Sequence, residues 1–259
     1  MHSVGKKQVP RIIPCLLIKG HGLTKTIQFG DGAYIGDAIN AVKIYNEKEV
    51  DEIMLLDIEA SKKSTEPRVE FIREIATEAF MPLSYGGGIT TLKQMEDLFK
   101  AGVEKVCLNS VVYSNPDLVN QASKIYGSQS VVVSVDVKKT PLLGYKLFSA
   151  GGTTVQKVKL IDHVKKMQDL GAGEIVINSI DRDGMMKGFD TDLITQVANA
   201  IDVPLVALGG AGSHDDLVKA INAGSSAVAA GSIFVFHGKH KAVLITYPSR
   251  ARLKELFLK

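Results

Sequence analysis

The stretch VDEIMLLDI, from Val50 to Ile58, returns in the second half of the chain as AGEIVINSI, from Ala172 to Ile180. Three more pairs of segments repeat in the same order and at nearly the same separation. They are PLSYGGGIT (82–90) with PLVALGGAG (204–212), EKVCLNS (104–110) with SAVAAGS (226–232), and IIPCLLIK (12–19) with VVVSVDVK (131–138). Self-similarity over a long fixed period is typical of folds built from equivalent structural units. The repeat therefore predicts two similar halves that close on each other.

Short apolar runs rich in β-branched residues recur along the chain and alternate with stretches of helical spacing. In PRVEFIREIATEAF, for example, Val69, Ile72 and Ile75 fall on one helical face. Runs that are apolar throughout are typical of parallel strands covered by helices. The predicted strands are Ile12–Ile18, Ile53–Ile58, Pro82–Tyr85, Lys105–Asn109, Ser130–Val137, Glu174–Ser179, Pro204–Leu208 and Ala227–Ala230.

Eight strand–helix units in 259 residues match the size of an α/β (β/α)8 TIM barrel. A doubly wound open sheet is the alternative, and the repeat favours the barrel. No linker rich in Pro, Gly or Ser separates the halves. We therefore predict one domain over residues 1–259, with halves of about residues 11–125 and 130–240.

The bulk composition excludes several classes of protein. A net charge of +3 is too small to predict nucleic-acid binding, although it suits an anionic substrate. Cys15 and Cys107 lie in apolar runs and belong to no CxxC pair, so we expect buried free thiols in a reducing compartment. His237 and His240 have metal-like spacing but no evident third ligand, so no metal site is predicted.

We also expect no targeting signal. The N-terminal segment MHSVGKKQVPR has no long apolar run and does not resemble a signal peptide. No stretch approaches the roughly 20 apolar residues of a membrane span. We therefore expect a cytoplasmic protein that contacts neither nucleic acid nor a membrane.

Two glycine clusters follow the predicted third and seventh strands, Gly86–Gly88 and Gly209–Gly212. Small polar residues end the strand after each cluster: Asn109 and Ser110 in one half, Gly231 and Ser232 in the other. Glycine lets a backbone approach a ligand closely, and free N–H groups bind anions. The clusters predict two phosphate sites on opposite sides of the barrel mouth, or else two tight turns.

Acid/base candidates lie at the same strand ends. Asp136 ends an otherwise apolar strand, where burial raises a carboxyl pKa and makes a usable proton carrier; the alternative is a carboxylate that caps backbone. Asp181 and Asp183, in the loop NSIDRDG, either contact substrate or form turns. Asp57 ends the second strand, at the position that Ser179 takes in the repeat.

Four charged residues stand at strand starts, at the opposite end of the barrel. From chemistry alone, a ring of two positive and two negative charges there is expected to hold the barrel bottom closed. The four residues are Arg11, Glu52, Lys105 and Glu174.

Together these motifs closely resemble the cyclase (synthase) subunit of imidazole glycerol phosphate synthase, a family of histidine biosynthesis. The resemblance runs from RIIPCL at Arg11 to AAGSIFVF at Ala229 and includes SYGGGI, GAGEI, NSIDRDG, GFDTDLI and GGAGSHDDL. It implies a duplicated (β/α)8 barrel that takes ammonia from a separate glutaminase subunit. That ammonia cleaves and cyclises a ribulosyl-imidazole carboxamide ribotide, which carries a phosphate at each end. No metal or redox cofactor is implied.

The resemblance also assigns roles to residues of this chain. It implies a catalytic Asp136, and substrate orientation by Asp183, Lys25, Asp57 and Asn178. The charged ring becomes the gate through which ammonia enters, with the glutaminase docked on that N-terminal face of the barrel. The implied phosphate-binding residues are Gly88, Asn109 and Ser110 on one side, and Gly184, Gly210, Gly231 and Ser232 on the other.

One departure from the family pattern is large. The family's catalytic aspartate on the first strand falls on Leu17, and a leucine carries no proton. The C-terminal stretch HGKHKAVLITYPSR also departs from the family. Both features resemble a paralogous second-copy branch linked to surface-polysaccharide genes. Its members are expected to take ammonia from a glutaminase-like partner and a third protein and to convert a sugar's acetamido group to an acetamidino group.

We therefore expect an ammonia-using subunit of this amidinating branch. The alternative is the authentic cyclase of histidine biosynthesis, which makes imidazole glycerol phosphate and aminoimidazole carboxamide ribotide. A scaffold that docks and activates a glutaminase is a third reading. A phosphosugar isomerase, which needs two acid/base residues and no ammonia gate, is a fourth.

Overall fold

The computed structural model describes residues 8–238 and 240–258. No signal peptide is predicted in the N-terminal segment MHSVGKKQVPR. Residues 1–7 of that segment lie outside the described residues. Within the described ranges, no helix combines the length and apolar character needed to cross a membrane.

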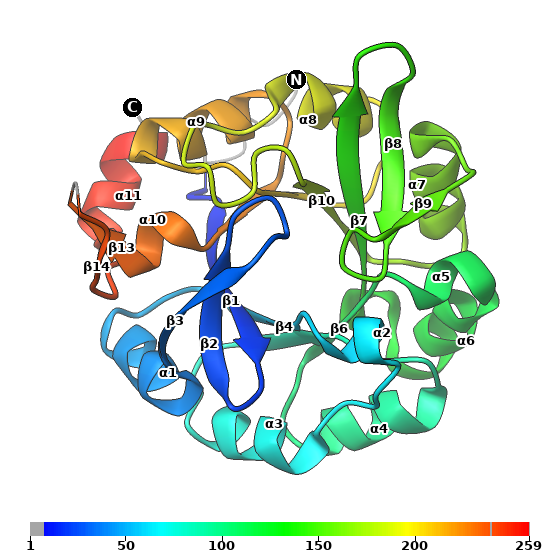
Figure 1. The fold of residues 1–259 in the computed structure, drawn as a ribbon, viewed down its shortest axis with the longest axis horizontal. Coiled ribbons are helices and arrows are strands. Elements are labelled where there is room, and N and C mark those ends of the chain that lie inside the picture. Colours follow the sequence, from blue (N-terminus) through cyan, green and yellow to red (C-terminus); the bar gives the residue numbers. More distant parts are fainter. Residues whose placement is uncertain (1–7, 239, 259) are drawn as a thin grey trace, which may run out of the picture.

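Eight parallel strands of the described chain close into a barrel ringed by helices (Figure 1). Closure comes from the last strand pairing with the first, Ile13 opposite Ala229, and from the two halves joining where Asn178 lies opposite Asp136. All eight predicted strands are present, so the predicted (β/α)8 barrel is confirmed. The strands are β1 (Arg11–Lys19), β4 (Ile53–Asp57), β5 (Leu83–Gly86), β6 (Lys105–Leu108), β7 (Val131–Thr140), β10 (Glu174–Ser179), β11 (Leu205–Leu208) and β12 (Ala227–Ala230).

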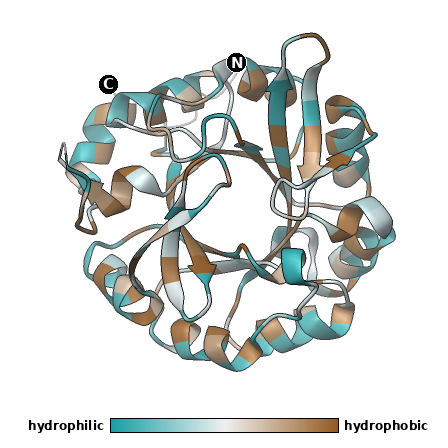
Figure 2. Ribbon diagram, in the orientation of Figure 1, coloured by the Kyte–Doolittle hydropathy of each residue, from teal (hydrophilic) through white to brown (hydrophobic). Residues whose placement is uncertain are grey.

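Several helices begin where the sequence supplies a side chain that caps the first turn. Thr91 and Gln94 form a reciprocal capping box at one helix start, and Ser213 with Asp216 forms the equivalent box in the other half. Figure 2 shows hydrophobic and hydrophilic residues side by side on the outer helices, as expected for helices with one buried face. The helices are α1 (Ala38–Glu47), α2 (Ala60–Lys63), α3 (Val69–Thr77), α4 (Leu92–Lys100), α5 (Val111–Ser114), α6 (Asp117–Tyr126), α7 (Leu160–Asp169), α8 (Thr191–Ala198), α9 (His214–Asn222), α10 (Ser232–Val235) and α11 (Arg250–Phe257).

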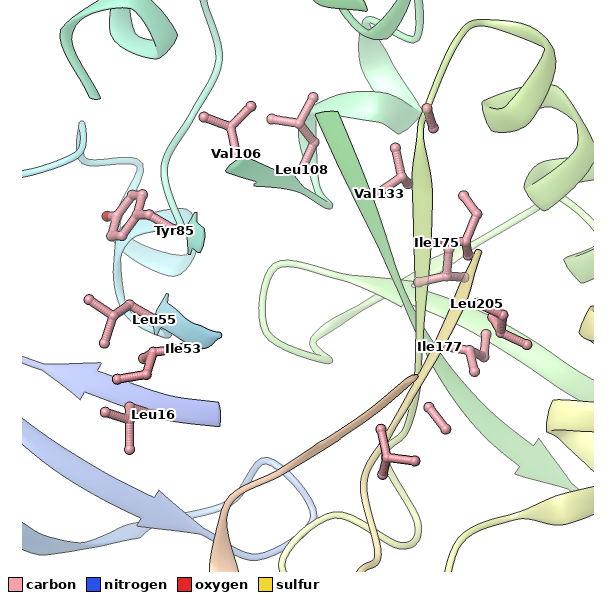
Figure 3. Packing of buried hydrophobic residues seen from close by; sticks show 14 of the residues in the cluster. Leu16, Ile53, Leu55, Tyr85, Val106, Leu108, Val133, Ile175, Ile177 and Leu205 are labelled. Carbon is pink, nitrogen blue, oxygen red and sulfur yellow. The ribbon is translucent and has the colours of Figure 1, made fainter. Parts of the chain in front are cut away.

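Alternation along the strands divides the apolar residues into two cores. Outward side chains such as Leu55, Tyr85 and Val133 pack between the strands and the helices (Figure 3). Inward ones such as Met54 and Val132, together with Cys15 and Cys107, fill the barrel interior. Each large apolar side chain buried in this way contributes about 1.5–3 kcal/mol. Because successive residues face opposite sides, the inward residue at each strand end determines the chemistry of the mouth. Both cysteines are buried and free, as predicted.

Three hairpins that the sequence did not predict are added to the barrel. One follows β1 and consists of β2 (Gly22–Thr26) and β3 (Gly32–Asp37). A second extends β7 through β8 (Gly144–Ser149) and β9 (Thr154–Gln156). The third, β13 (Phe236–His237) with β14 (Ala242–Val243), lies in the divergent C-terminal segment, before α11. The first two surround the mouth and contribute to the site.

Candidate active site

A cavity of about 620 Å³ opens at the C-terminal ends of the barrel strands. Its lining comes from both halves of the barrel and from the loops above them. The inward-facing strand residues among them are Cys15, Leu17, Leu56, Gly86, Cys107, Asn109, Ser134, Asp136, Asn178 and Leu208.

Asp136 lies in this cavity with only 8% of its surface exposed. The amide groups of Asn109 and Asn178 donate hydrogen bonds to its two carboxylate oxygens, at 3.1 and 3.3 Å. Burial, which is the largest cause, and the nearby charge of Asp183 together raise the pKa of Asp136 to about 7, even though both hydrogen bonds favour the charged form. A carboxyl group with this pKa can both accept and release a proton near neutral pH.

The raised pKa of Asp136 predicts a pH-dependent stability. An aspartate in an unfolded chain loses its proton near pH 4, whereas folded Asp136 keeps it until about pH 7. The folded state therefore binds more protons in this window, and stability falls as pH rises through it. Asp136→Asn removes this loss, so the variant should gain roughly 2–4 kcal/mol relative to the parent between about pH 4 and about pH 7.5. Urea unfolding at both pH values measures the gain; a difference independent of pH would contradict the assignment.

Leu17 occupies the corresponding place on the opposite strand, β1. It lines the same cavity, is 8% exposed, and lies opposite Leu56 of β4 and Thr24 of β2 in the sheet register. The mouth therefore presents a buried carboxyl group on β7 and an apolar side chain on β1.

A second carboxyl group in the cavity belongs to the loop after β10. Asp183 has a raised pKa because it is buried, and the charge of Lys25 and a 3.4 Å hydrogen bond from the Thr26 hydroxyl partly offset that rise. The backbone of this loop also holds the β2–β3 hairpin, since the Gln28 N–H donates to the Asp183 carbonyl at 2.9 Å. Lys25 and Asp183, both predicted to orient substrate, are thus brought together.

Lys25 is buried, which the sequence did not reveal. Its ammonium group donates to the Cys15 carbonyl oxygen at 3.4 Å, and its side chain lies directly against Gly231. A Cβ at position 231 would overlap the end of the Lys25 side chain and come within 2.9 Å of the Cys15 carbonyl oxygen, so a larger residue there would displace the lysine. The hairpin after β1 thereby places a cation inside the mouth.

The first predicted phosphate set faces the open cavity. Gly88 adopts φ +71°, and its N–H contacts the Ser61 hydroxyl at 3.5 Å. The Ser110 hydroxyl accepts a 3.0 Å hydrogen bond from the Ala150 N–H, in the turn between β8 and β9. Asn109 has a further contact that the sequence reasoning missed, since its amide also holds Asp136. The alternation of side chains along each strand could have revealed this contact, because it turns both Asn109 and Asp136 toward the barrel interior.

The second predicted set lies outside the lining of this cavity. The β2–β3 hairpin covers it in part: the backbone of Thr26 and Ile27 lies against Gly184, and Lys25 lies against Gly231. Gly210 is packed against the Gly188 backbone, whose N–H donates to the Gly210 carbonyl at 2.9 Å, and Ser232 is buried. The structure therefore separates the two predicted phosphate sets. The first set lines the open cavity, and the β2–β3 hairpin partly covers the second.

Asp57 lies at the edge of the cavity with its carboxylate occupied. It accepts from the N–H groups of Glu59 and Ala60, at 3.0 and 3.1 Å, and pairs with Arg68 at 3.3 Å. These contacts fix the start of α2 and the loop beside Gly87. In this structure Asp57 shapes the cavity wall, and Arg68 is a partner that the sequence reasoning did not identify.

The four charged residues at the other end of the barrel meet in a closed ring. Glu52 pairs with Arg11 at 2.5 Å and with Lys105 at 2.9 Å. Glu174 pairs with Lys105 at 3.3 Å and also with Arg11. The glutamates are buried, whereas Arg11 is about one-third exposed. The ring thus separates the barrel interior from the N-terminal face. Across the described part of the chain, no cluster of three or more His, Cys, Asp or Glu side chains is placed to hold a metal ion.

Comparison with known proteins adds to this geometry. A family model described as histidine biosynthesis protein matches residues 11–241. The chain is 50% identical to a Pseudomonas aeruginosa protein provisionally named imidazole glycerol phosphate synthase subunit hisF2, over 94% of this chain and 97% of that protein. It is also 50% identical to a provisionally named hisF3 subunit of Vibrio vulnificus, over 95% of each chain. An imidazole glycerol phosphate synthase subunit HisF of Dictyoglomus thermophilum is 40% identical, over 87% of this chain and 90% of that protein.

Proposed function

The chain belongs to the histidine biosynthesis protein family, and we propose that it acts there as a barrel subunit that uses ammonia from a glutaminase partner. Within the family, we place it in the paralogous branch that converts a sugar's acetamido group to an acetamidino group for surface-polysaccharide biosynthesis. The similarity to relatives named as second and third copies, hisF2 and hisF3, is consistent with this placement.

One observation carries the proposal: Leu17 lines the mouth where the cyclase reaction is expected to need a second proton carrier. Ring closure and cleavage require an acid and a base on opposite sides of the substrate. Exchanging an amide oxygen for nitrogen makes a smaller demand, because the two protons lost by the attacking ammonia can leave with the oxygen as water. Asp136 alone, with a pKa of about 7, suits that relay, since it can carry the two protons one after the other from nitrogen to oxygen.

The charged ring supports the use of ammonia. Arg11, Glu52, Lys105 and Glu174 close the end of the barrel opposite the cavity. Between the two ends lie small or apolar inward side chains such as Ile13, Cys107 and Val132. We infer that a glutaminase docks on the N-terminal face and that ammonia passes the ring to reach Asp136.

The authentic cyclase remains the second candidate, and Asp183 favours it. This buried carboxyl group lines the same cavity and has a raised pKa. It is therefore the group best placed to serve as the second proton carrier in a compensated site.

A glutamine-dependent assay separates the two functions. The chain is purified together with candidate glutaminases and supplied with glutamine and either the ribotide or an acetamido sugar. We expect an amidino sugar, identified by mass spectrometry as replacement of oxygen by NH, and no imidazole glycerol phosphate. Robust growth of a histidine auxotroph that carries this chain and a glutaminase would overturn the assignment to the amidinating branch.

A further inference from the structure

The hairpin that extends β7 leaves the barrel altogether. β7 continues past Asp136 to Thr140, the chain turns over residues 141–143, and β8 returns from Gly144. In Figure 1 this hairpin, drawn in green, reaches past the ring of helices at the top of the picture. It starts from the C-terminal end of a barrel strand, so it belongs to the mouth side of the molecule.

Two leucines form the tip of this hairpin. Leu142 is 96% exposed and Leu143 is 69% exposed. The turn that carries them is well fixed: Pro141 restricts its first residue, Gly144 adopts φ +67°, and the Thr140 hydroxyl donates to the Gly144 carbonyl at 2.8 Å. Single exposed leucines are ordinary, but two adjacent ones held outward at a projecting tip call for a physical explanation.

Lysines flank this tip, and nearby carboxylates do not fully neutralise their positive charges. Lys138 and Lys146 lie directly opposite each other on the paired strands, where like charges disfavour the hairpin. Within the described ranges, neither has a carboxylate oxygen within 4.0 Å of its ammonium group. Lys139 lies over the Tyr145 ring and reaches only Asp192, at 3.9 Å. The hairpin therefore combines an apolar tip with a positively charged base, and an anionic surface would relieve the repulsion.

We propose that the tip formed by Leu142 and Leu143 is a peripheral contact for an anionic lipid bilayer. A narrow convex turn offers far less than the roughly 800 Å² per partner of a stable protein interface. A bilayer, in contrast, admits a narrow apolar wedge and attracts lysines at its surface. The sequence predicted no membrane contact because it has no long apolar run, but a two-residue wedge needs none.

The tip also lies apart from the opposite end of the barrel. It continues from the C-terminal end of β7 and projects past the ring of helices (Figure 1), whereas the charged ring of Arg11, Glu52, Lys105 and Glu174 stands at the strand starts. A protein docked on the N-terminal face would not compete with the bilayer. The proposal does not depend on which acceptor the cavity binds.

Tryptophan fluorescence tests the contact directly, because the chain contains no tryptophan. Leu142→Trp provides a single reporter at the tip. Phe80→Trp is the matched control, since Phe80 is 86% exposed and precedes β5 on the opposite face. With vesicles of phosphatidylcholine and phosphatidylglycerol at three to one, we expect a blue shift for Leu142→Trp only. Vesicles of pure phosphatidylcholine should give a much smaller shift.

Vesicle sedimentation gives a second readout on the protein without tryptophan. The double variant Leu142→Ser and Leu143→Ser should reduce the partition coefficient on the order of 10-fold, and Lys138→Gln with Lys146→Gln should reduce it several-fold. Circular dichroism verifies that both variants fold. Absence of sedimentation with the anionic vesicles, or equal sedimentation of the Ser variant, would overturn the proposal and leave a protein partner as the occupant to seek.

Discussion

Replacing Asp136 with Asn is expected to lower glutamine-dependent product formation by about 10²–10⁴-fold, the range that one general acid/base group contributes. Asn keeps the shape of the side chain, and its one oxygen can still accept from Asn109 or Asn178, but it carries no titratable proton. The loss should therefore appear in turnover, measured with saturating glutamine and acceptor, and the fold should be preserved.

Asp192→Asn is the matched control, because this aspartate is exposed on α8 and should leave turnover unchanged. Glutaminase stimulation is measured in the same samples. If Asp136→Asn leaves product formation intact while glutaminase stimulation persists, Asp136 carries no proton and the chain acts mainly as a scaffold.

Replacing Leu17 with Asp is expected to create cyclase activity on the ribotide, by at least about 10²-fold over the parent chain. The new carboxylate would lie in the cavity on β1, on the side of the barrel away from β7, and so complete an acid/base pair with Asp136. Its negative charge should also raise the pKa of Asp136 further. Formation of imidazole glycerol phosphate from the ribotide and ammonium salts measures the gain without requiring a partner.

Leu17→Asn separates proton transfer from a change in polarity. It places at position 17 a polar side chain with the shape of aspartate but without a titratable proton. Equal cyclase activity in the Asn and Asp variants would show that cavity polarity, not a proton carrier, limits the reaction. If neither variant gains activity, the divergence from the cyclase involves more residues than Leu17.

The strands were predictable because burial on both faces leaves a continuous apolar run that no helix or loop of this length shares. Asp136 was predictable for the same reason, as a carboxylate with apolar residues on both sides in such a run. The direction of its pKa shift was predictable too, but the size was not, because it depends on how deeply the closed barrel buries Asp136 and on the opposing hydrogen bonds from Asn178 and Asn109. Such contacts between distant segments exist only after the barrel has closed.

The β2–β3 hairpin shows where local patterns fail. Its sequence, GLTKTIQFGDGAYIGD, mixes glycines, charges and isolated apolar residues, so it has neither helical nor strand periodicity. It becomes ordered because Gln28 bonds to the loop after β10 and Lys25 enters the mouth beside Gly231. The hairpin partly covers the second predicted phosphate set because of these tertiary contacts. The sequence around the glycines of that set could not have predicted this.

The charged ring has a consequence for how a small neutral molecule can cross it. Each glutamate contacts both cations, so the four side chains form a cycle of four links. Breaking any one link still leaves every charge with one oppositely charged neighbour. A passing molecule can therefore part the ring at a single link, and no isolated charge is left in the low-dielectric interior, where isolation costs most. If ammonia crosses the ring as proposed, the redundancy of the cycle, rather than the weakness of any pair, would keep the barrier to opening low while the resting barrel stays shut.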